Sequence, residues 1–167
     1  VQTCALPIFT QYTRAILFVD IYGQCPDMQR LSQLRDQYDL YIVEDAAHSL
    51  GNTYYGRPVG SFADITCFSF NPVKNLGAMG DAGAVAGRAD LIERCRMFRD
   101  HGRNTKFVFE EIGYNARIDN LQANILLAKL PYVKKWNERR YQIAQKYSAA
   151  LEPIVSVPLE NKISEHV

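Results

Sequence analysis

The sequence predicts an α/β fold in which helices flank a mainly parallel β-sheet. Two short apolar runs rich in branched side chains, residues 14–21 and 40–45, have the composition of buried strands. Between them, residues 28–39 repeat apolar side chains at helical spacing. A strand, a helix and a second strand over about 30 residues make a crossover connection, which joins parallel neighbours in one sheet.

The remaining elements of the first half follow from local signals. Asp27 is expected to cap the helix over residues 28–39, because an aspartate side chain accepts hydrogen bonds from the first free N–H groups of a helix. Residues 51–61, rich in glycine and polar side chains, are predicted to be a loop. Residues 63–70 are predicted to form a third strand, and the small residues 82–87 a fourth.

The second half is predicted to be mainly helical. Residues 88–102 form an amphipathic pattern that ends at Gly102, a residue type suited to a helix C-terminus. A longer helical pattern starts near residue 119 and is interrupted by Pro131. We expect residues 9–150 to be part of one large domain and residues 151–167 to begin the connection to a second, smaller one.

Composition excludes several classes of function. The 167 residues are 47% hydrophobic and 22% charged with a net charge of +1, so no basic surface for nucleic acid is expected. No apolar run approaches the roughly 18 to 20 residues that span a bilayer, so no membrane segment is expected. The four cysteines lack metal-ligand spacing and disulfide density, which favours reduced thiols in the cytoplasm and no metal site.

The first eight residues, VQTCALPI, show no relation to the pattern that follows. They resemble the translation of a common sequencing-library adaptor. We therefore interpret residues 1–8 as a non-native scar and leave them out of the functional reading.

Two residues carry the predicted chemistry. Asp45 ends one predicted strand and Lys74 lies just beyond another, so both are expected at the edge of the sheet where open parallel sheets bind ligands. A lone loop lysine is usually a surface charge, and a lone aspartate after a strand is usually a turn former. Together they fit pyridoxal phosphate, which needs a lysine amine for its aldehyde and a carboxylate for its ring nitrogen.

Four segments in order extend this argument to a family. They are VEDAAHSLG (43–51), GRPVGSFADITCFSFNPVKNLGAMGDAGAV (56–85), FRDHG (98–102) and IGYNARIDNLQANIL (112–126). Over residues 9 to 167 the chain resembles the sugar aminotransferases of the DegT/DnrJ/EryC1/StrS family. The resemblance implies the large domain of a fold-type I, pyridoxal-phosphate-dependent aminotransferase, truncated at both ends.

The resemblance also implies roles for single residues. Lys74 matches the lysine that forms the Schiff base with the cofactor and later moves a proton, and Asp45 matches the acid at the pyridine nitrogen. Ser69 matches a hydroxyl that binds the cofactor phosphate. His48 is expected beside the ring, the alternative being a core histidine. Asn115 resembles a residue that reaches the phosphate in the neighbouring subunit of a homodimer, the alternative being a solvated loop asparagine.

The implied reaction moves an amino group from glutamate or a similar donor to a keto sugar carried on a nucleotide. The segment KNLGAMGDAGA, residues 74–84, resembles members that act on 3-keto sugars linked to dTDP or UDP. Related dehydratases carry histidine in place of the lysine, so Lys74 favours amination. The rival interpretation is a catalytically idle or regulatory homologue; a nucleotide-binding Rossmann domain is disfavoured because no GxGxxG follows a strand.

Three functional parts of the family are expected outside this chain. A phosphate-binding turn and a ring-stacking residue should precede residue 9, and a small domain should follow residue 167. We therefore expect the isolated polypeptide to bind the cofactor poorly and to have no activity.

Overall fold

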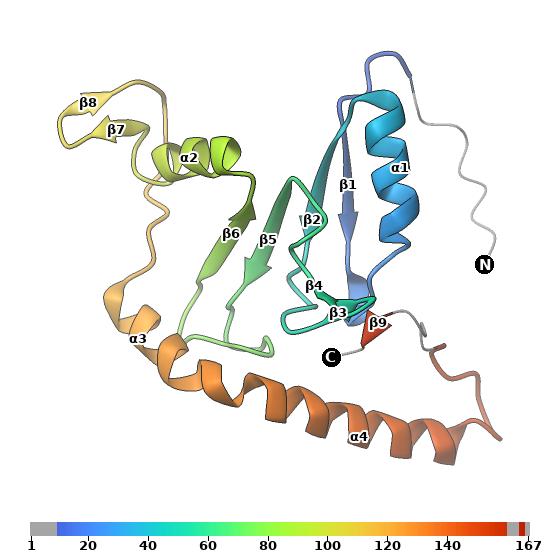
Figure 1. The fold of residues 1–167 in the computed structure, drawn as a ribbon. Helices are drawn as coiled ribbons and strands as arrows, with labels where there is room; N and C mark the ends of the chain where they lie inside the picture. Colours follow the sequence, from blue (N-terminus) through green and yellow to red (C-terminus); the bar gives the residue numbers. More distant parts are fainter. Residues whose placement is uncertain (1–9, 160–163, 166–167) are drawn as a thin grey trace.

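The computed structural model describes residues 10–159 and 164–165, so the predicted scar at residues 1–8 lies outside the described part of the chain. Its main sheet has four strands in the order β1-β2-β5-β6. The strands are β1 (Ala15–Val19), β2 (Tyr41–Asp45), β5 (Ile65–Ser69) and β6 (Gly83–Gly87). The pairs β1–β2 and β2–β5 are parallel and β5–β6 is antiparallel, which confirms the predicted mainly parallel sheet (Figure 1).

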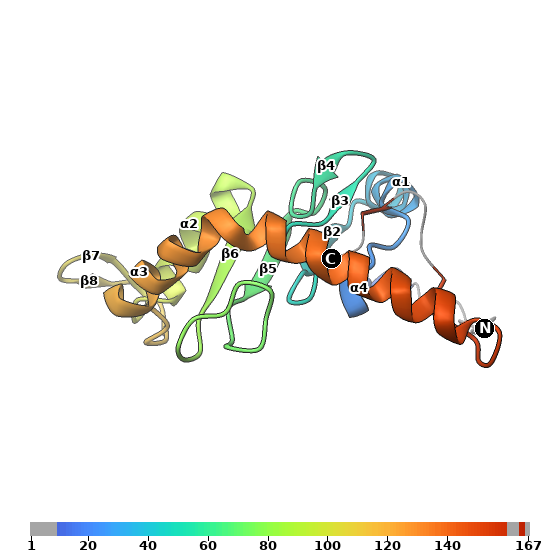
Figure 2. The same ribbon diagram turned by 90° about the horizontal axis from the view of Figure 1, so that it is seen from below.

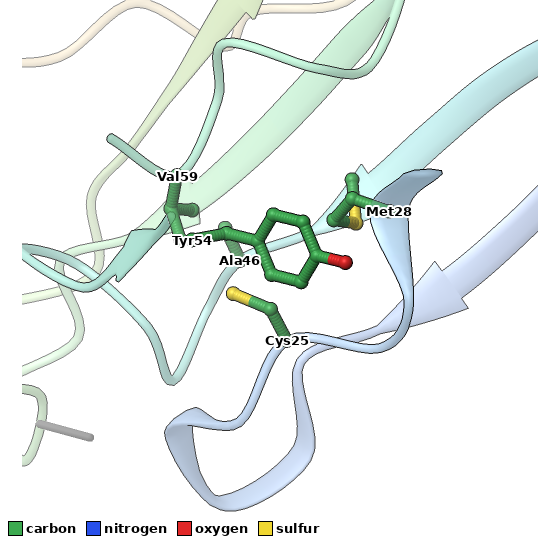
Figure 3. Close-up of a cluster of buried hydrophobic side chains, with 5 residues drawn as sticks. All are labelled: Cys25, Met28, Ala46, Tyr54 and Val59. Atoms are coloured by element: carbon green, nitrogen blue, oxygen red, sulfur yellow. The ribbon is translucent and has the colours of Figure 1, made fainter. Parts of the chain in front are cut away.

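Helix α1 (Met28–Tyr38) connects β1 to β2, as predicted. The Asp27 carboxylate accepts a hydrogen bond from the Arg30 backbone N–H at 3.0 Å, so the predicted cap is confirmed. Met28 at the start of the helix is buried in one of the two core clusters, with Cys25, Ala46, Tyr54 and Val59. The Tyr54 ring lies in the middle of this cluster (Figure 3), and its hydroxyl donates to Asp27.

The register of the sheet separates two sets of side chains. Asp45 lies opposite Cys67, and Glu44 lies opposite Thr66. Because successive side chains of a strand point to opposite faces, Asp45, Cys67 and Ser69 share one face and Glu44 and Thr66 share the other. Phe18, opposite Glu44, packs against the cluster that contains Met28, so the Glu44 face is the one that α1 covers.

Asp64 fixes the start of β5 against β2. Its buried carboxylate accepts from the Ile42 backbone N–H at 2.8 Å, while its own N–H donates to the Ile42 carbonyl at 3.0 Å. Arg88, just after β6, forms an ion pair with the same carboxylate at 3.4 Å. These contacts hold the ends of three strands together.

Helix α2 (Ala89–Phe98) is shorter than predicted, since it ends at Phe98 rather than at Gly102. Gly102 instead closes the turn that follows the helix: its φ is +73°, and its N–H donates to the Met97 carbonyl. A Cβ at this position would lie 1.7 Å from the Glu111 carbonyl oxygen, so a glycine is required there. A hairpin of β7 (Arg103–Thr105) and β8 (Val108–Phe109) follows.

Three smaller features lie around this framework. A 3₁₀ turn, η1 (Ile21–Gly23), follows β1. The segment predicted as a loop contains a short hairpin of β3 (Thr53–Tyr54) and β4 (Arg57–Pro58), and β9 (Ser164–Glu165) pairs with β3. Two-residue strands leave no alternating pattern in a sequence, which is why this hairpin was not predicted.

The predicted long helix is divided at Pro131, as expected. Helix α3 (Asn120–Lys129) is followed by a 3₁₀ turn, η2 (Leu130–Tyr132), and by helix α4 (Val133–Leu151). Helix α4 runs past the edge of the sheet toward which β1 and β5 point (Figure 1), and seen from below it extends along the length of the molecule (Figure 2). No helix in the described residues has the length and apolarity needed to cross a membrane.

Candidate active site

Lys74 lies in the connection from β5 to β6, which folds back on itself. The Phe70 N–H donates to the Ala82 carbonyl at 2.8 Å and the Phe70 carbonyl accepts from Ala78 at 2.8 Å, so the connection begins and ends at the sheet. Within it, the Lys74 N–H donates to the Asn71 carbonyl at 2.9 Å. Lys74 is thereby placed in a closed turn beyond the carboxyl end of β5.

Gly77 is required by the packing of this turn. A Cβ on Gly77 would lie 2.4 Å from the Pro72 carbonyl oxygen, which is backbone and cannot rotate away. The structure shows that Gly77 leaves room for the turn itself, and that a Cβ on Gly80 would meet the Gln122 side chain at 3.2 Å.

Asp45 and Ser69 lie at the same edge of the sheet and on the same face. Asp45 is the last residue of β2 and pairs with Cys67, and Ser69 ends β5 two residues later. Burial is the main cause that raises the pKa of the Cys67 thiol, with a further contribution from the negative charge of Asp45. Cys95 of α2 also contributes, which places α2 on this face of the sheet.

The predicted catalytic groups have unused bonding capacity. One Asp45 carboxylate oxygen accepts from the Ala47 N–H at 3.0 Å, and the other has no hydrogen-bond partner within residues 10–159. The half-buried Lys74 ammonium likewise forms no hydrogen bond or ion pair with the described side chains. The Ser69 oxygen accepts from the Asn71 N–H at 3.3 Å, which leaves its hydroxyl hydrogen free to donate.

His48 and Asn115 are both exposed. His48 follows β2 at the sheet edge, so its exposure disfavours a core histidine. Asn115 forms a backbone bridge with Asp100 and lies in the segment between the β7–β8 hairpin and α3. That segment is on the far side of β6 from β2 (Figure 1), and no hydrogen bond joins Asn115 to the other predicted site residues. The structure thus brings Asp45, Ser69 and the Lys74 turn to one edge and leaves Asn115 apart.

A pair of buried carboxyl groups beneath the site was not predicted. Asp20 and Glu44 lie on the α1 face and are 0% and 1% exposed. Asp20 accepts from the Ser49 hydroxyl at 2.7 Å, and Glu44 accepts from the Thr66 hydroxyl at 2.6 Å and the Gly60 N–H at 3.1 Å. One oxygen of each carboxyl has no donor in the described protein.

Burial is the main cause that raises the pKa of both acids. It raises the pKa of Glu44 to about 7, and the nearby charge of Asp20 adds to the effect. The interaction between the two side chains raises the pKa of Glu44 further and, against the effect of burial, lowers the pKa of Asp20, so the proton is held on Glu44 rather than on Asp20. A charged residue in an apolar strand run, as in LYIVED, was the available sequence signal for this pair.

A shallow basic cavity of about 450 Å³ lies beside the Lys74 turn. Its lining contains four cationic side chains, the Trp136 ring and no acidic residue; the cations are Lys74, Lys129, Arg139 and Arg140. Positive charges gathered around a concave surface attract anions, so this cavity suits a phosphate-bearing ligand.

Comparison with known proteins identifies the family. The model of the DegT/DnrJ/EryC1/StrS aminotransferase family matches residues 7–166. The chain belongs to this family. Among curated members, it is 42% identical over 151 residues to the dTDP-3-amino-3,4,6-trideoxy-alpha-D-glucose transaminase of Streptomyces venezuelae, covering 90% of this chain and 40% of the relative. It is 40% identical over 147 residues to a pleiotropic regulatory protein of Geobacillus stearothermophilus, covering 87% and 40%.

Solved structures of the family share the fold. S. venezuelae DesV, determined in complex with a ketimine intermediate, matches with a TM-score of 0.90 and 40% identity over 95% of this chain and 43% of that one. Ntda from Bacillus subtilis, with bound cofactor PMP, matches with a TM-score of 0.81 and 39% identity over 87% and 34%. The fold-type prediction is therefore confirmed. The chain spans about 40% of the length of the curated relatives it matches.

Proposed function

We propose that the natural protein containing this chain is a pyridoxal-phosphate-dependent aminotransferase that aminates a keto sugar carried on a nucleotide. The observation that carries the proposal is the arrangement at one edge of the sheet. Asp45 and Ser69 end adjacent parallel strands on one face, and Lys74, whose amine has no partner within residues 10–159, lies in the closed turn beyond them. This is the edge at which open parallel sheets bind ligands.

The donors and acceptors present fit that cofactor. The Asp45 oxygen that has no partner in the described part of the chain can accept from a protonated ring nitrogen, and the Ser69 hydroxyl can donate to a phosphate. No carboxylate among the same described residues binds the Lys74 amine. When bound, pyridoxal phosphate supplies an aldehyde for the amine and a ring that accepts electrons. In its neutral form, the Lys74 amine could act as a general base that takes a proton from the substrate and then as a general acid that returns the proton to a neighbouring atom.

Two features support an anionic, nucleotide-linked substrate. The basic cavity beside the Lys74 turn offers cations for phosphates and the Trp136 ring for stacking. The S. venezuelae relative is named for a 3-amino sugar linked to dTDP, in agreement with the resemblance of residues 74–84 to members acting on 3-keto sugars. We therefore propose a dTDP- or UDP-linked 3-keto sugar as acceptor and glutamate as donor, in the cytoplasm.

We also propose that the enzyme is a homodimer with shared active sites. Large apolar side chains on and after the β7–β8 hairpin are open to solvent: Phe107 is 81% exposed, Ile112 92% and Tyr114 72%. Such a surface is typical of a protein interface. Asn115 lies in the same segment, so a partner seated there would bring the partner's site within its reach.

Replacement of Lys74 tests this function. In the natural protein, we expect Lys74→Ala to abolish the link to the cofactor and to lower amination by at least about a thousandfold. Borohydride reduction followed by mass spectrometry should attach the cofactor to residue 74 in the wild type and nowhere in the variant. Lys134→Ala, on the exposed part of α4, is the matched control. Normal amination by Lys74→Ala would show that the assignment is wrong.

The name of the Geobacillus relative supports a second candidate, a regulatory homologue without catalysis. A panel of 3-keto and 4-keto sugar nucleotides, each with glutamate, separates the two. Cofactor absorbance that glutamate fails to change, with no amino sugar from any panel member, would favour the regulatory protein.

A further inference from the structure

Asn137 of α4 is a buried amide that joins three segments of the chain. It is 7% exposed and, with Val133, one of the two buried residues of α4. Its side-chain oxygen accepts from the Asn75 amide at 3.1 Å and from the Arg140 guanidinium at 3.3 Å. Its nitrogen donates to the Leu50 carbonyl at 3.1 Å. Two donors face the oxygen and an acceptor faces the nitrogen, so the orientation of the amide follows from its partners.

The partners of Asn137 belong to the two loops that carry the proposed site. Asn75 follows Lys74 directly, and Leu50 lies in the turn that starts at Asp45 and contains His48. One side chain therefore connects the loop after β2 and the loop after β5 to the same turn of a helix. A Cβ on Gly51 would lie 2.8 Å from the Asn137 nitrogen, so the chain packs closely against this amide.

The junction between α3 and α4 also holds the end of the Lys74 turn. The Lys129 ammonium at the end of α3 donates to the Gly77 carbonyl. Leu76 and Ala78 are buried in a core cluster with Leu126 of α3 and Val133 of α4. Residues 75 to 78 are thus fixed by hydrogen bonds and apolar contacts on one side, while the Lys74 side chain has no partner among the described residues.

We propose that Asn137 is a positioning residue for Lys74. By binding Asn75 and Leu50 at once, it sets where the lysine turn lies relative to the loop after Asp45. The proposal rests on the proposed function, because it concerns the placement of that lysine against the cofactor. Displacement of a reacting group by about 1 Å can cost about a hundredfold in rate, so a group that fixes this distance affects turnover without contacting substrate.

The test uses the natural protein with Asn137→Ala, Asn75→Ala and the double variant. Glu138→Ala, on the exposed face of the same helical turn, is the control. We expect each single variant to lower kcat by about 10- to 100-fold and to change the substrate KM by less than about threefold. The pH at which the cofactor–lysine absorbance changes should shift by about 0.5 or more in both, and not in the control. The double variant should resemble the more impaired single variant, because both substitutions remove the same hydrogen bond between Asn75 and Asn137.

The possible outcomes distinguish a failure of this inference from a failure of the proposed aminotransferase function. If the wild type forms no cofactor–lysine absorbance, the proposed function fails. If it does, and Asn137→Ala lowers only the melting temperature while kcat and the absorbance transition stay as in the wild type, Asn137 is merely structural and the inference is wrong. Should Asn137→Ala fail to fold, Asn75→Ala decides alone, since it removes the amide contact from a partly buried loop position.

Discussion

Replacement of Glu44 by glutamine should change how stability depends on pH. Glu44 is 1% exposed and its pKa is raised from 4.5 to about 7, mainly by burial. Its proton is therefore retained in the folded state over a pH range in which the unfolded chain has lost it. The free energy of unfolding is unaffected by this group below pH 4.5, falls as the pH rises from 4.5 to about 7, and stays lowered above that.

The magnitude follows from the width of this range. A difference of about 2.5 pH units at about 1.36 kcal/mol each gives a loss of about 3 kcal/mol between pH 4.5 and 8. Glutamine has nearly the same shape and can accept from the Thr66 hydroxyl as Glu44 does, yet it cannot ionise. We therefore compare the free energy of unfolding of Glu44→Gln with that of the wild type at two pH values. The variant-minus-wild-type difference should be up to about 3 kcal/mol larger at pH 8 than at pH 4.5.

Urea unfolding of the natural protein, followed by circular dichroism at several pH values, measures this difference. Glu138→Gln removes an exposed carboxylate from α4 and controls for the loss of one charge. A wild-type-minus-variant difference that stays constant from pH 4.5 to 8 would refute the reasoning. It would mean that Glu44 ionises as readily in the fold as in the unfolded chain.

Two further predictions concern the site. Lys74→Ala and Asn115→Ala, each strongly impaired alone, should recover about a quarter of the wild-type activity when coexpressed in equal amounts. About half of the dimers are then mixed, and a mixed dimer with shared sites has one of its two sites free of both substitutions. No recovery would place both residues in the same site of one subunit. Gly77→Ala should cost about 1–3 kcal/mol in urea unfolding, because its Cβ would lie 2.4 Å from the Pro72 carbonyl, whereas a cost near zero would show that the turn relaxes freely.

The fold was predictable where a local pattern and its physical cause coincide. The branched apolar runs predicted β1 and β2 correctly. Asp27 predicted the start of α1, because its carboxylate accepts a hydrogen bond from a free N–H group of the helix. Pro131 gave the break between α3 and α4. The end of α2 was missed because the signal used, Gly102, serves the next turn, where its positive φ brings the backbone onto Glu111.

The site was predictable in part. The positions of Asp45 and Ser69 follow from parallel strands ending at a common edge, so their shared face could be inferred once the register was known. Asn137 could not be inferred, because it lies 62 residues from Asn75 and looks like any polar residue of an exposed helix. Glu44 and Asp20 were also missed, since a sequence does not show which charged side chains the register buries.

The neighbouring acids Glu44 and Asp45 of β2 face opposite sides of the sheet, and only the alternation of side chains along the strand separates them. Sliding β2 by one position would turn Glu44 toward the face of Cys67 and Ser69 and turn Asp45 toward the buried face that α1 covers. Asp64 opposes such slippage, because its two hydrogen bonds to Ile42 fit a single alignment. Insertions or deletions within residues 41–45 should therefore exchange the chemistry of the two faces, even where they leave the strand intact.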